Sequence, residues 1–436
     1  MLHQVSSDDR HQAVRVGDAR ADARAPAATI DFDPALLQPA SPPRLAIVLG
    51  MSETGLGTLR LLARRGARCW GVDAPLDLPG FRSRYCERRI HVPTELSPAE
   101  LSAILRHAIL GEGRRPVVVP TADRFVKLLS DARDGLRDRF DMALPAPPIV
   151  DDLLDKRRFA DLAARAGLRV PRTTHLSDLA ALEEAARRTG YPAVVKPRKP
   201  GDEERASFPK AIVLWTAGEA RALAATAASR GRVPALVVQE YIPGGDACHV
   251  SVAMAFDSRS APIASFVSRK RRQGNHGAGV GTFVESHRDE EAAATARTFL
   301  QRIGYVGVAE MEMKRHAVTG ELFAIEVNPR LWSQVALPAA LGVDFALLYC
   351  QMAAGAVGGA EIQPLPRPCA WQDLWSDLYW TFGRGGYWRK GEISLGDWLR
   401  QSLATRAHPY FAWHDPAPAI RRAMDALRRL TRGERA

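Results

Sequence analysis

The feature that most constrains this chain is a central stretch, GYVGVAEMEMKRHAVTGELFAIEVNPR, at residues 304–330. Polar and apolar side chains alternate on both sides of a short Thr-Gly turn, which is typical of a β-hairpin because strand side chains point alternately to opposite faces. If the loop centres near Thr319, Glu312 on the first strand lies across from Glu326 on the second. Two opposed carboxylates destabilise a strand pair, so the pattern predicts a group that compensates their charge.

A divalent cation would provide that compensation. Mg²⁺ prefers oxygen ligands, commonly takes one or two protein carboxylates, and completes its shell with water and substrate phosphates. We therefore expect Glu312, Glu326 and the side-chain amide of Asn328 to form a metal site. The alternative, for the hairpin taken alone, is a solvated polar face at the edge of a sheet.

Two predicted strands upstream end in residues suited to binding a polar ligand. The segment GYPAVVKPR places Lys196 at a strand end, where a lysine can reach an anionic group. The segment ALVVQEYIPGGDA predicts a strand that ends in a Pro-Gly-Gly turn. The edge of this strand offers backbone N–H and C=O groups to a planar heterocycle. Asp246, beyond the turn, can accept hydrogen bonds from hydroxyl groups. Taken singly, the first reads as a surface lysine and the second as a buried strand.

The N-terminal part of the chain alternates short apolar runs with helical patterns. Strands are predicted at Leu45–Leu49, Arg68–Val72 and Val117–Val119, with a glycine-opened helix after the first and a helix at 124–136 after the third. This alternation predicts a parallel, doubly wound α/β domain. Its GxxxxGxG run departs from the GxGxxG dinucleotide fingerprint, so we interpret those glycines as structural.

The length of 436 residues allows two or three domains. Residues 1–43 lack periodicity and predict a disordered leader. A proline cluster ends the first domain near residue 148, and a helix capped by Asp151 or Asp152 and ended by Gly167 opens the second. The Trp- and Arg-rich residues 356–436 predict an appended extension that either fills the core or covers an interface.

Four motifs occur in order along the chain: DK at a helix start, VVKP, QEYIPG, and ME followed by IEVNPR. This ordered set, over roughly residues 45 to 350, resembles the ATP-grasp superfamily of ligases. Within the superfamily, the sequence is most similar to the carboxylate-amine ligase branch that includes D-aspartate ligases. The segments that carry this similarity are SRKRRQGNHGAGVGTFVES, GVAEMEMKR and IEVNPRLWSQ. The resemblance implies an α/β and α+β chain, with a Rossmann-like pre-ATP-grasp domain at 44–148 and a two-lobed ATP-grasp domain at 149–355. The small lobe would cover about 153–242 and the large lobe about 243–355.

The resemblance also implies roles for residues that match the family's motifs. ATP and Mg²⁺, with Mn²⁺ as an alternative, are the implied cofactors. Arg330 would stabilise the anionic reacting centre, and Glu312, Glu326 and Asn328 would hold the metal. The residues that would contact the nucleotide are Lys156 and Lys196 at the phosphates, Gln239, Glu240, Tyr241 and Ile242 along the adenine, and Asp246 at the ribose.

One segment departs from the family pattern. The glycine-rich flap expected soon after Lys196 contains only Gly201, so Lys210 is a candidate to replace its phosphate contacts as a point charge. The glycine-rich run at 273–282 is a better candidate for a loop that closes over substrate. The neighbouring basic residues are candidates to bind a substrate carboxylate, or else form a solvated basic face: Arg269, Lys270, Arg271 and Arg272.

The implied reaction is ATP-dependent coupling of a carboxylate to an amine through an acyl phosphate, with release of ADP and phosphate. The protein would contribute positioning and charge neutralisation, without a Ser, Cys or His nucleophile. Two alternatives stay open: an ATP-grasp enzyme with bicarbonate or a non-amine acceptor, and a non-catalytic ATP-binding regulatory protein. The sequence does not name the carboxylate or the amine, although amino acids are candidates.

The composition of the chain limits the classes of partner that it can bind. The net charge of +11 is compatible with small anionic substrates, nucleic acid or an anionic membrane surface. We expect small-molecule substrates and no nucleic acid, and we interpret the amphipathic tail AIRRAMDALRRLTRG as a helix that packs on the enzyme. No apolar run reaches the roughly 20 residues of a membrane span, and the N-terminus lacks a signal-peptide pattern.

Five cysteines without a CxxC pair predict reduced thiols. We expect a cytoplasmic protein, with a homodimer as an option.

Overall fold

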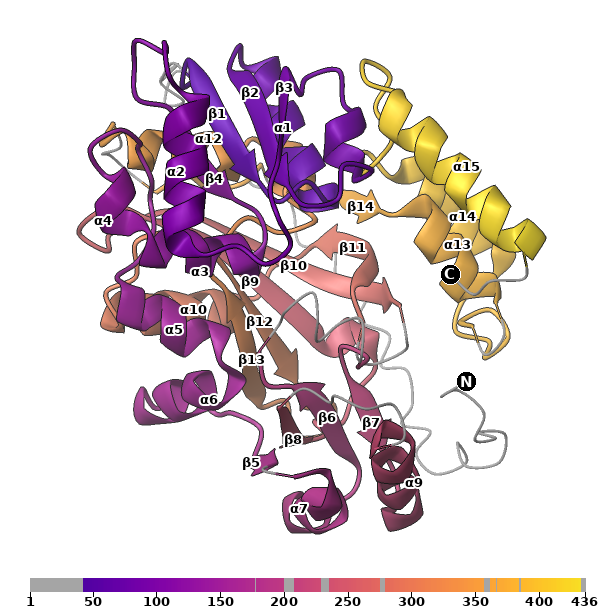
Figure 1. The fold of residues 1–436 in the computed structure, drawn as a ribbon. Coiled ribbons are helices and arrows are strands. Elements are labelled where there is room, and N and C mark those ends of the chain that lie inside the picture. Colours follow the sequence, from indigo (N-terminus) through magenta and orange to yellow (C-terminus); the bar gives the residue numbers. More distant parts are fainter. Residues whose placement is uncertain are drawn as a thin grey trace. The chain divides into compact units, whose positions relative to one another are not determined.

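The computed structural model describes residues 42–176, 178–199, 208–228, 235–274, 279–356, 361–365, 367–383 and 386–432. The residues from Ser41 onward form one compact unit, which holds three β-sheets (Figure 1). Most of the predicted leader lies outside the described residues. Within them, no helix is both long enough and apolar enough to cross a membrane.

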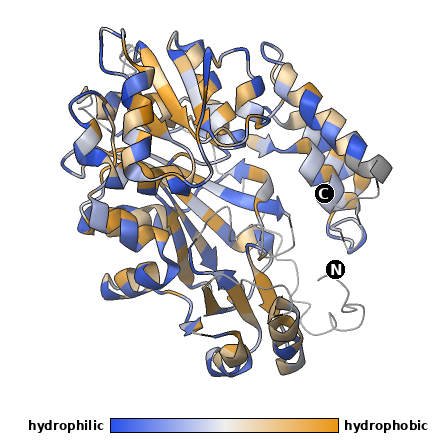
Figure 2. Cartoon of the chain, in the orientation of Figure 1, coloured by the Kyte–Doolittle hydropathy of each residue, from blue (hydrophilic) through white to orange (hydrophobic). Residues whose placement is uncertain are grey.

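The first sheet is the predicted parallel one. Its spatial order is β3-β2-β1-β4, and every pairing is parallel. Its strands are β1 (Leu45–Leu49), β2 (Arg68–Asp73), β3 (Arg88–His91) and β4 (Val117–Pro120). The sequence did not predict β3, which has only one buried residue among four and therefore carries no apolar run. Every residue of β1 is buried, because helices cover both faces of a parallel sheet (Figure 2).

The helices around this sheet differ from the prediction in detail. They are α1 (Glu53–Arg64), η2 (Pro79–Arg82), α2 (Pro98–Ala108), α3 (Asp123–Asp131) and α4 (Arg133–Leu136). The helix predicted at 124–136 is thus two helices. The glycines at the start of α1 have structural roles: Gly50, before the helix, has a φ of +101°, and a Cβ on Gly55, in its first turn, would lie 1.9 Å from the Gly50 carbonyl oxygen.

The connection to the rest of the chain is helical. It comprises α5 (Pro147–Leu154) and α6 (Lys156–Arg165). The proline cluster near residue 148 begins a helix: Pro147 occupies the first turn of α5, where its missing N–H costs no hydrogen bond. The predicted cap is wrong: Asp155, not Asp151 or Asp152, caps α6 by accepting from the backbone N–H groups of Arg157 and Arg158.

The second sheet has four strands in the order β5-β8-β6-β7, all antiparallel. They are β5 (Thr173–Leu176), β6 (Ala193–Pro197), β7 (Ile212–Leu214) and β8 (Leu236–Glu240), and their helices are η3 (Leu179–Ala181), α7 (Leu182–Thr189) and α9 (Ala217–Ala228). This sheet brings the two strands singled out in the sequence side by side, because β6 pairs directly with β8; the pairing is antiparallel, with Lys196 opposite Val237 and Glu240 opposite Ala193.

The third sheet is the largest, with the order β13-β12-β9-β10-β11-β14 and antiparallel pairing throughout. Its strands are β9 (His249–Phe256), β10 (Pro262–Gln273), β11 (Gly281–Ser286), β12 (Gly307–Arg315), β13 (Leu322–Asn328) and β14 (Ala370–Gln372). The short helix η4 (Asp246–Cys248) precedes β9. One face packs on α10 (Glu290–Arg302) through a cluster that includes Phe299, Val252 and Met311.

The C-terminal segment continues the third sheet through β14, whose Trp371 is 2% exposed. The helices of this segment and those before it are α11 (Ala336–Ala339), α12 (Phe345–Ala353), α13 (Leu374–Phe382), α14 (Leu395–Ala404) and α15 (Ala417–Arg432). Its tryptophans differ in burial, since Trp371 and Trp398 are buried while Trp388 and Trp413 are exposed.

The tail helix leaves two large apolar side chains exposed, although it packs on the rest of the molecule. α15 packs near η2, and the preceding Asp415 forms a buried ion pair with Arg60 of α1. Ile420 and Met424 are nevertheless 57% and 44% exposed. The helix therefore contacts the rest of the molecule, as predicted, through residues other than these two.

Candidate active site

The predicted hairpin is present, with the predicted register. β12 pairs antiparallel with β13, and Glu312 lies opposite Glu326 while Glu310 lies opposite Asn328. A register irregularity follows Glu312: the pairing shifts by one residue next to this carboxylate pair and then continues from Met313 opposite Ala324. The hairpin is at the edge of the third sheet, with β12 also paired to β9.

Lysines compensate the charge of the two opposed carboxylates. Lys270 on β10 donates a hydrogen bond of 2.6 Å to Glu312. The Nζ atoms of Lys156 and Lys210 lie 3.9 and 3.7 Å from the carboxylate of Glu326. Burial by itself would raise the pKa of Glu326, but Lys210, Lys156 and Lys196 outweigh it and hold that pKa far below its usual range.

Glu310 belongs to this cluster but was not selected from the sequence. It is 5% exposed, and the Asn328 amide donates to it at 3.2 Å. Burial, followed by the neighbouring charge of Glu312, raises the pKa of Glu310 to about 7. Strand alternation already placed Glu310 on the same face as Glu312, so the signal was present in the sequence.

A cavity of about 70 Å³ lies between the second and third sheets and collects most of the predicted nucleotide contacts. We call it the nucleotide cavity. Seven of the eight predicted residues line it: Lys156, Lys196, Lys210, Gln239, Glu240, Tyr241 and Ile242. Glu312 and Glu326 line the same cavity, so the lysines and carboxylates meet across it. Segments up to 170 residues apart in the sequence therefore converge here, from Lys156 to Glu326.

Asp246, the eighth residue, is held at the edge of this region. Its carboxylate accepts a 2.6 Å hydrogen bond from the Gln273 amide and another hydrogen bond from the Tyr387 hydroxyl. Gln273 itself lines the nucleotide cavity, so Asp246 is one hydrogen bond away from the cavity wall.

His249 is a lining residue that the sequence reasoning missed. Its Nε2 atom is buried and has no hydrogen-bond partner among the described residues. Burial, together with nearby lysines of which Lys270 is the strongest influence, lowers the pKa of His249 well below its usual value, so the ring is neutral near pH 7. A buried polar atom without a partner at a cavity wall is suited to a ligand that supplies the missing hydrogen bond.

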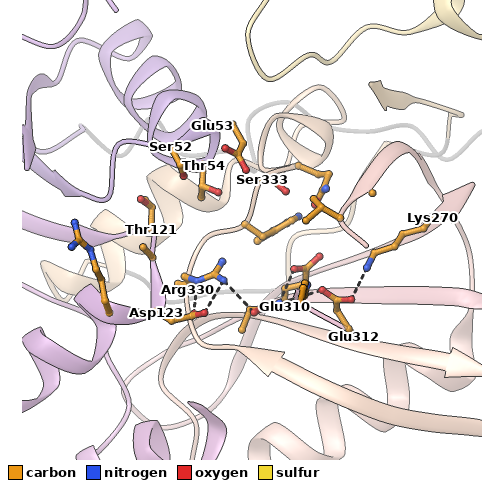
Figure 3. A pocket seen from close by; sticks show the side chains of 18 residues that line it. Ser52, Glu53, Thr54, Thr121, Asp123, Lys270, Glu310, Glu312, Arg330 and Ser333 are labelled. Atoms are coloured by element: carbon orange, nitrogen blue, oxygen red, sulfur yellow. Dashed lines mark hydrogen bonds and ion pairs between the residues drawn. The ribbon is translucent and has the colours of Figure 1, made fainter. Parts of the chain in front are cut away.

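A second cavity, of about 300 Å³, lies between the first and third sheets, and we call it the substrate cavity (Figure 3). Arg330, which follows β13, lines it and is paired with Asp123 at the start of α3 through contacts of 2.6 and 3.2 Å. The first sheet contributes the segments that follow β1 and β4: Ser52, Glu53, Thr54, Thr121, Ala122, Asp123 and Arg124.

The two cavities share part of their walls. Lys210, Lys270 and Glu312 line both. In Figure 3 the Lys270 ammonium points toward the Glu312 carboxylate on one side of the substrate cavity, and Arg330 lies on the other side beside Asp123. A ligand spanning the shared wall would meet two lysines and a carboxylate at the junction.

The four consecutive basic residues on β10, at 269–272, have different surroundings. Lys270 faces the cavities, whereas Arg269 pairs with Glu285 at 2.5 Å and is not among the described residues that line either cavity. Arg271 is exposed, and Arg272 forms a buried ion pair with Asp377 of α13. The substrate-carboxylate contact expected of Arg269 and Arg272 thus lacks support from the geometry, because Glu285 and Asp377 hold their guanidinium groups.

Two predicted loops fall outside the part of the chain that the structure describes: the flap region around Gly201 and the centre of the glycine-rich run at 273–282. The described residues contain no group of three or more His, Cys, Asp or Glu side chains arranged to hold a metal ion. The proposed metal site of two carboxylates and an amide is of a different kind, and it agrees with the preference of Mg²⁺ for few protein ligands.

Comparison with known proteins identifies the domain that contributes residues to both cavities. Residues 161–333 match the ATP-grasp domain family. The chain is 30% identical over 189 residues to an N5-carboxyaminoimidazole ribonucleotide synthase of Synechococcus elongatus, covering 43% of this chain and 45% of that protein. It is 27% identical over 213 residues to a formate-dependent phosphoribosylglycinamide formyltransferase of Synechocystis, covering 48% and 50%. The matches thus span about half the length of each relative.

Solved structures share the fold over a longer stretch. An N5-carboxyaminoimidazole ribonucleotide synthetase in complex with ADP has a TM-score of 0.60 at 15% identity, covering 76% of this chain and 81% of that chain. The biotin carboxylase domain of Hydrogenobacter thermophilus 2-oxoglutarate carboxylase, with MgADP and bicarbonate, gives 0.59 at 15% identity and covers 75% and 73%. An L-amino acid ligase of Bacillus licheniformis gives 0.57 at 15% identity and covers 75% and 79%.

These identities are low, so the solved structures establish the fold alone. They agree with a parallel N-terminal sheet followed by an ATP-grasp fold, which confirms the predicted fold class. The family match also confirms the resemblance read from the ordered motifs, because it shows that residues 161–333 of the chain form an ATP-grasp domain.

Proposed function

We propose that this protein is an ATP-dependent ligase that activates a carboxylate as an acyl phosphate and couples it to an amine. The observation that carries the proposal is the shared wall of the two cavities, where Lys210, Lys270 and Glu312 meet. A nucleotide in one cavity and a carboxylate in the other would place the γ-phosphate next to its acceptor at this junction. Such placement supplies much of the catalysis in phosphoryl transfer.

The residues present fit ATP and a magnesium ion. Lys156, Lys196 and Lys210 supply positive charge for phosphates, and the buried Nε2 atom of His249 is available to a polar ligand. Glu312, Glu326 and Asn328 would hold the metal, which when bound would neutralise phosphate charge. In that state the lysines that now pair with the carboxylates would turn to the phosphates.

The chain's own residues would act as follows. A substrate carboxylate oxygen attacks the γ-phosphate, the bond to the β-phosphate oxygen breaks, and ADP leaves; Lys210 and Lys270 stabilise the transferred charge. An amine then attacks the acyl carbon, phosphate leaves, and the amine loses a proton. Arg330, fixed by Asp123, would stabilise the negative oxygens of the tetrahedral state.

The charges of the substrate cavity favour a zwitterionic substrate such as an amino acid. Its lining includes four cations, namely Arg124, Lys210, Lys270 and Arg330, and four acids, namely Glu53, Asp123, Glu310 and Glu312. Groups of both signs in one small cavity can pair with both ends of an amino acid. The fold shared with an L-amino acid ligase agrees with this proposal, as does the resemblance to D-aspartate ligases.

A second candidate is ATP-dependent carboxylation or formylation. The two relatives carry names of that kind, an N5-carboxyaminoimidazole ribonucleotide synthase and a formate-dependent formyltransferase. In that case bicarbonate or formate would be the activated carboxylate, and the substrate cavity would hold the amine. A ligase of either kind acts on small molecules.

The biotin carboxylase domain that shares this fold is described as a dimer, which supports testing the present protein for a homodimer.

The test is ADP release with Mg²⁺ and ATP over pools of amino acids, other carboxylates, bicarbonate and formate, with hydroxylamine added to trap an acyl phosphate. A hydroxamate formed from one carboxylate would identify the activated substrate. Calorimetric titration with ADP and Mg²⁺ provides the complementary measurement. Failure to bind nucleotide would contradict the proposal, while binding without turnover would favour the regulatory alternative.

A further inference from the structure

The C-terminal segment reaches the edge of the nucleotide cavity through one side chain, Tyr387, which is 3% exposed and lies between α13 and α14. Its hydroxyl accepts a 2.8 Å hydrogen bond from the Gln273 N–H and contacts both the Gln273 carbonyl, at 3.0 Å, and the Asp246 carboxylate. An ionised carboxylate is the stronger of these two acceptors, so the hydroxyl proton belongs to the Asp246 contact.

Gln273 links this contact to the cavity wall. Its side-chain amide donates to Asp246 at 2.6 Å, its Oε1 atom accepts from the Gly279 N–H at 3.3 Å, and its side chain lines the nucleotide cavity. Asp246 therefore accepts from one donor on β10 and from another in the C-terminal segment. Each of them fixes a different carboxylate oxygen.

The same segment also packs closely beside Gln273. A Cβ on Gly274 would lie 2.9 Å from Nε1 of Trp380, so α13 lies directly against the end of β10. Burial, and then the neighbouring Asp246, raises the pKa of Tyr387 well above its usual value, and the hydroxyl remains a donor at any pH the enzyme would meet. The contact is thus fixed both by packing and by its protonation state.

We propose that Tyr387 is a positioning residue for the nucleotide: it fixes Asp246 and Gln273 so that the Asp246 carboxylate accepts hydrogen bonds from the ribose hydroxyls. This inference rests on the proposed function, because it takes the nucleotide cavity as the ATP site. It assigns the C-terminal segment a role in nucleotide binding. A segment that only fills space would not contact the residue expected at the ribose.

Changing Tyr387→Phe removes the hydroxyl and keeps the ring, so packing is largely retained. We expect the affinity for ADP with Mg²⁺ to fall about 10-fold, the size of one well-placed hydrogen bond to a charged group. The affinity for 2′,3′-dideoxy-ADP should change less than about 2-fold, because this nucleotide lacks the hydroxyls that Asp246 would bind. Calorimetric titration of both nucleotides measures the two values.

Tyr379→Phe is the matched control, since Tyr379 belongs to α13 of the same segment and is not among the residues lining either cavity. It should bind both nucleotides as the wild type does. Equal losses for ADP and dideoxy-ADP in Tyr387→Phe would overturn the proposal and leave a general structural role. Unchanged affinity for ADP would overturn it as well.

A second variant keeps the inference testable if Tyr387→Phe folds poorly. Asp246→Asn alone should also reduce discrimination between the two nucleotides, and unchanged discrimination by this variant would overturn the proposal. Where Tyr387→Phe folds, the double variant should lose little beyond either single change because both act on the same contact. Independent losses that multiply would contradict the proposal. If the wild-type protein binds neither nucleotide, the proposed function itself fails, and that result is distinct from every outcome for the variants.

Discussion

At the scale of single residues, two opposed carboxylates on the hairpin indicate a binding site for cations and phosphates. Glu312 and Glu326 face each other across the ladder, which a purely structural hairpin would avoid. In the structure this conflict is relieved by Lys270, Lys156 and Lys210. These lysines are the same groups proposed to bind phosphates, so the charges that hold the hairpin together are also those that would bind ATP and the metal.

Glu326→Gln tests the metal assignment. The change removes one negative charge with little change in shape, so we expect turnover to fall by roughly 100-fold or more while the protein stays folded. The same loss is expected for Asn328→Ala. The measurement is ADP release with the activated substrate, together with circular dichroism.

Glu321→Gln is the control for this change. Glu321 lies in the same hairpin, pairs with Arg169, and is not among the residues that line either cavity. Its substitution should leave turnover near that of the wild type. Normal ADP release by Glu326→Gln would contradict the metal assignment.

Lys196 gives a prediction for pH dependence. Burial is the largest influence on this side chain and lowers its pKa to about 8, against the attraction of Glu326. The ammonium is therefore charged below about pH 8, and its charge is lost as the pH rises through that value. We expect the affinity for ADP to decline as the pH is raised from about 7 to about 9, as measured by calorimetric titration.

Lys196→Arg separates this effect from other titrations, because a guanidinium stays charged over the whole range. Its affinity for ADP can be lower than that of the wild type at neutral pH, yet it should decline less steeply between about pH 7 and about pH 9. The same slope in both proteins would assign the pH dependence to another group.

At the scale of elements, strand alternation decides which of the four basic residues on β10 reach the cavities. Lys270 contacts Glu312, while the adjacent Arg269 and Arg271 are directed toward Glu285, at 2.5 and 3.9 Å. Arg272 departs from a strict alternation, since a register irregularity lies between Lys270 and Arg272. It therefore joins β10 to α13 through Asp377 instead of exposing its charge.

The Arg272–Asp377 pair should be a strong stabilising contact between β10 and the C-terminal segment. Asp377 is fully buried and also accepts from Thr282, Gln372 and Trp398. Arg272→Met would leave that carboxylate buried without its cation, so we expect the free energy of unfolding to fall by about 3 to 5 kcal/mol. Urea denaturation measures the change.

Arg271→Met provides the comparison for this experiment, because Arg271 is the exposed neighbour on the same strand. Its loss should change the free energy of unfolding by less than about 1 kcal/mol. Similar small effects of both substitutions would show that the remaining donors to Asp377 are enough to hold the segment in place.

At the scale of the whole molecule, each cavity is a meeting point of two sheets. The nucleotide cavity lies between the second and third sheets, and the substrate cavity between the first and third. A nucleotide that contacts two sheets at once stabilises their arrangement, and binding to the folded state alone adds RT ln(1 + [L]/Kd). The stability of the protein should therefore report nucleotide binding directly.

ADP with Mg²⁺ should raise the melting temperature of the wild-type protein. At a ligand concentration of about 100 times the Kd the gain is about 2.7 kcal/mol. Adding EDTA should remove most of it, because the metal would no longer bridge the phosphates and the Glu312, Glu326 and Asn328 cluster. Differential scanning fluorimetry measures both shifts, and a gain that is insensitive to EDTA would contradict metal-assisted binding.

Sequence by itself determined the local features of this protein. The alternation at 304–330 predicted the hairpin and its register, and the apolar runs located three of the four strands of the first sheet. The ordered motifs identified the ATP-grasp domain. These features depend on side-chain periodicity and on short spacings, which are written directly in the order of residues. β3 and the cap at Asp155 were missed because their local signals are weak.

Only the tertiary structure decided which charged groups work together. It brought Asp123 to Arg330 across 207 residues and added His249 to the site. It also assigned Arg269 and Arg272 to other acids and placed Tyr387 against Asp246. Each of these pairings joins different elements, and periodicity within one element carries no information about which other element packs against it. The sequence therefore determined the candidate chemistry, and the packing of the sheets determined the site.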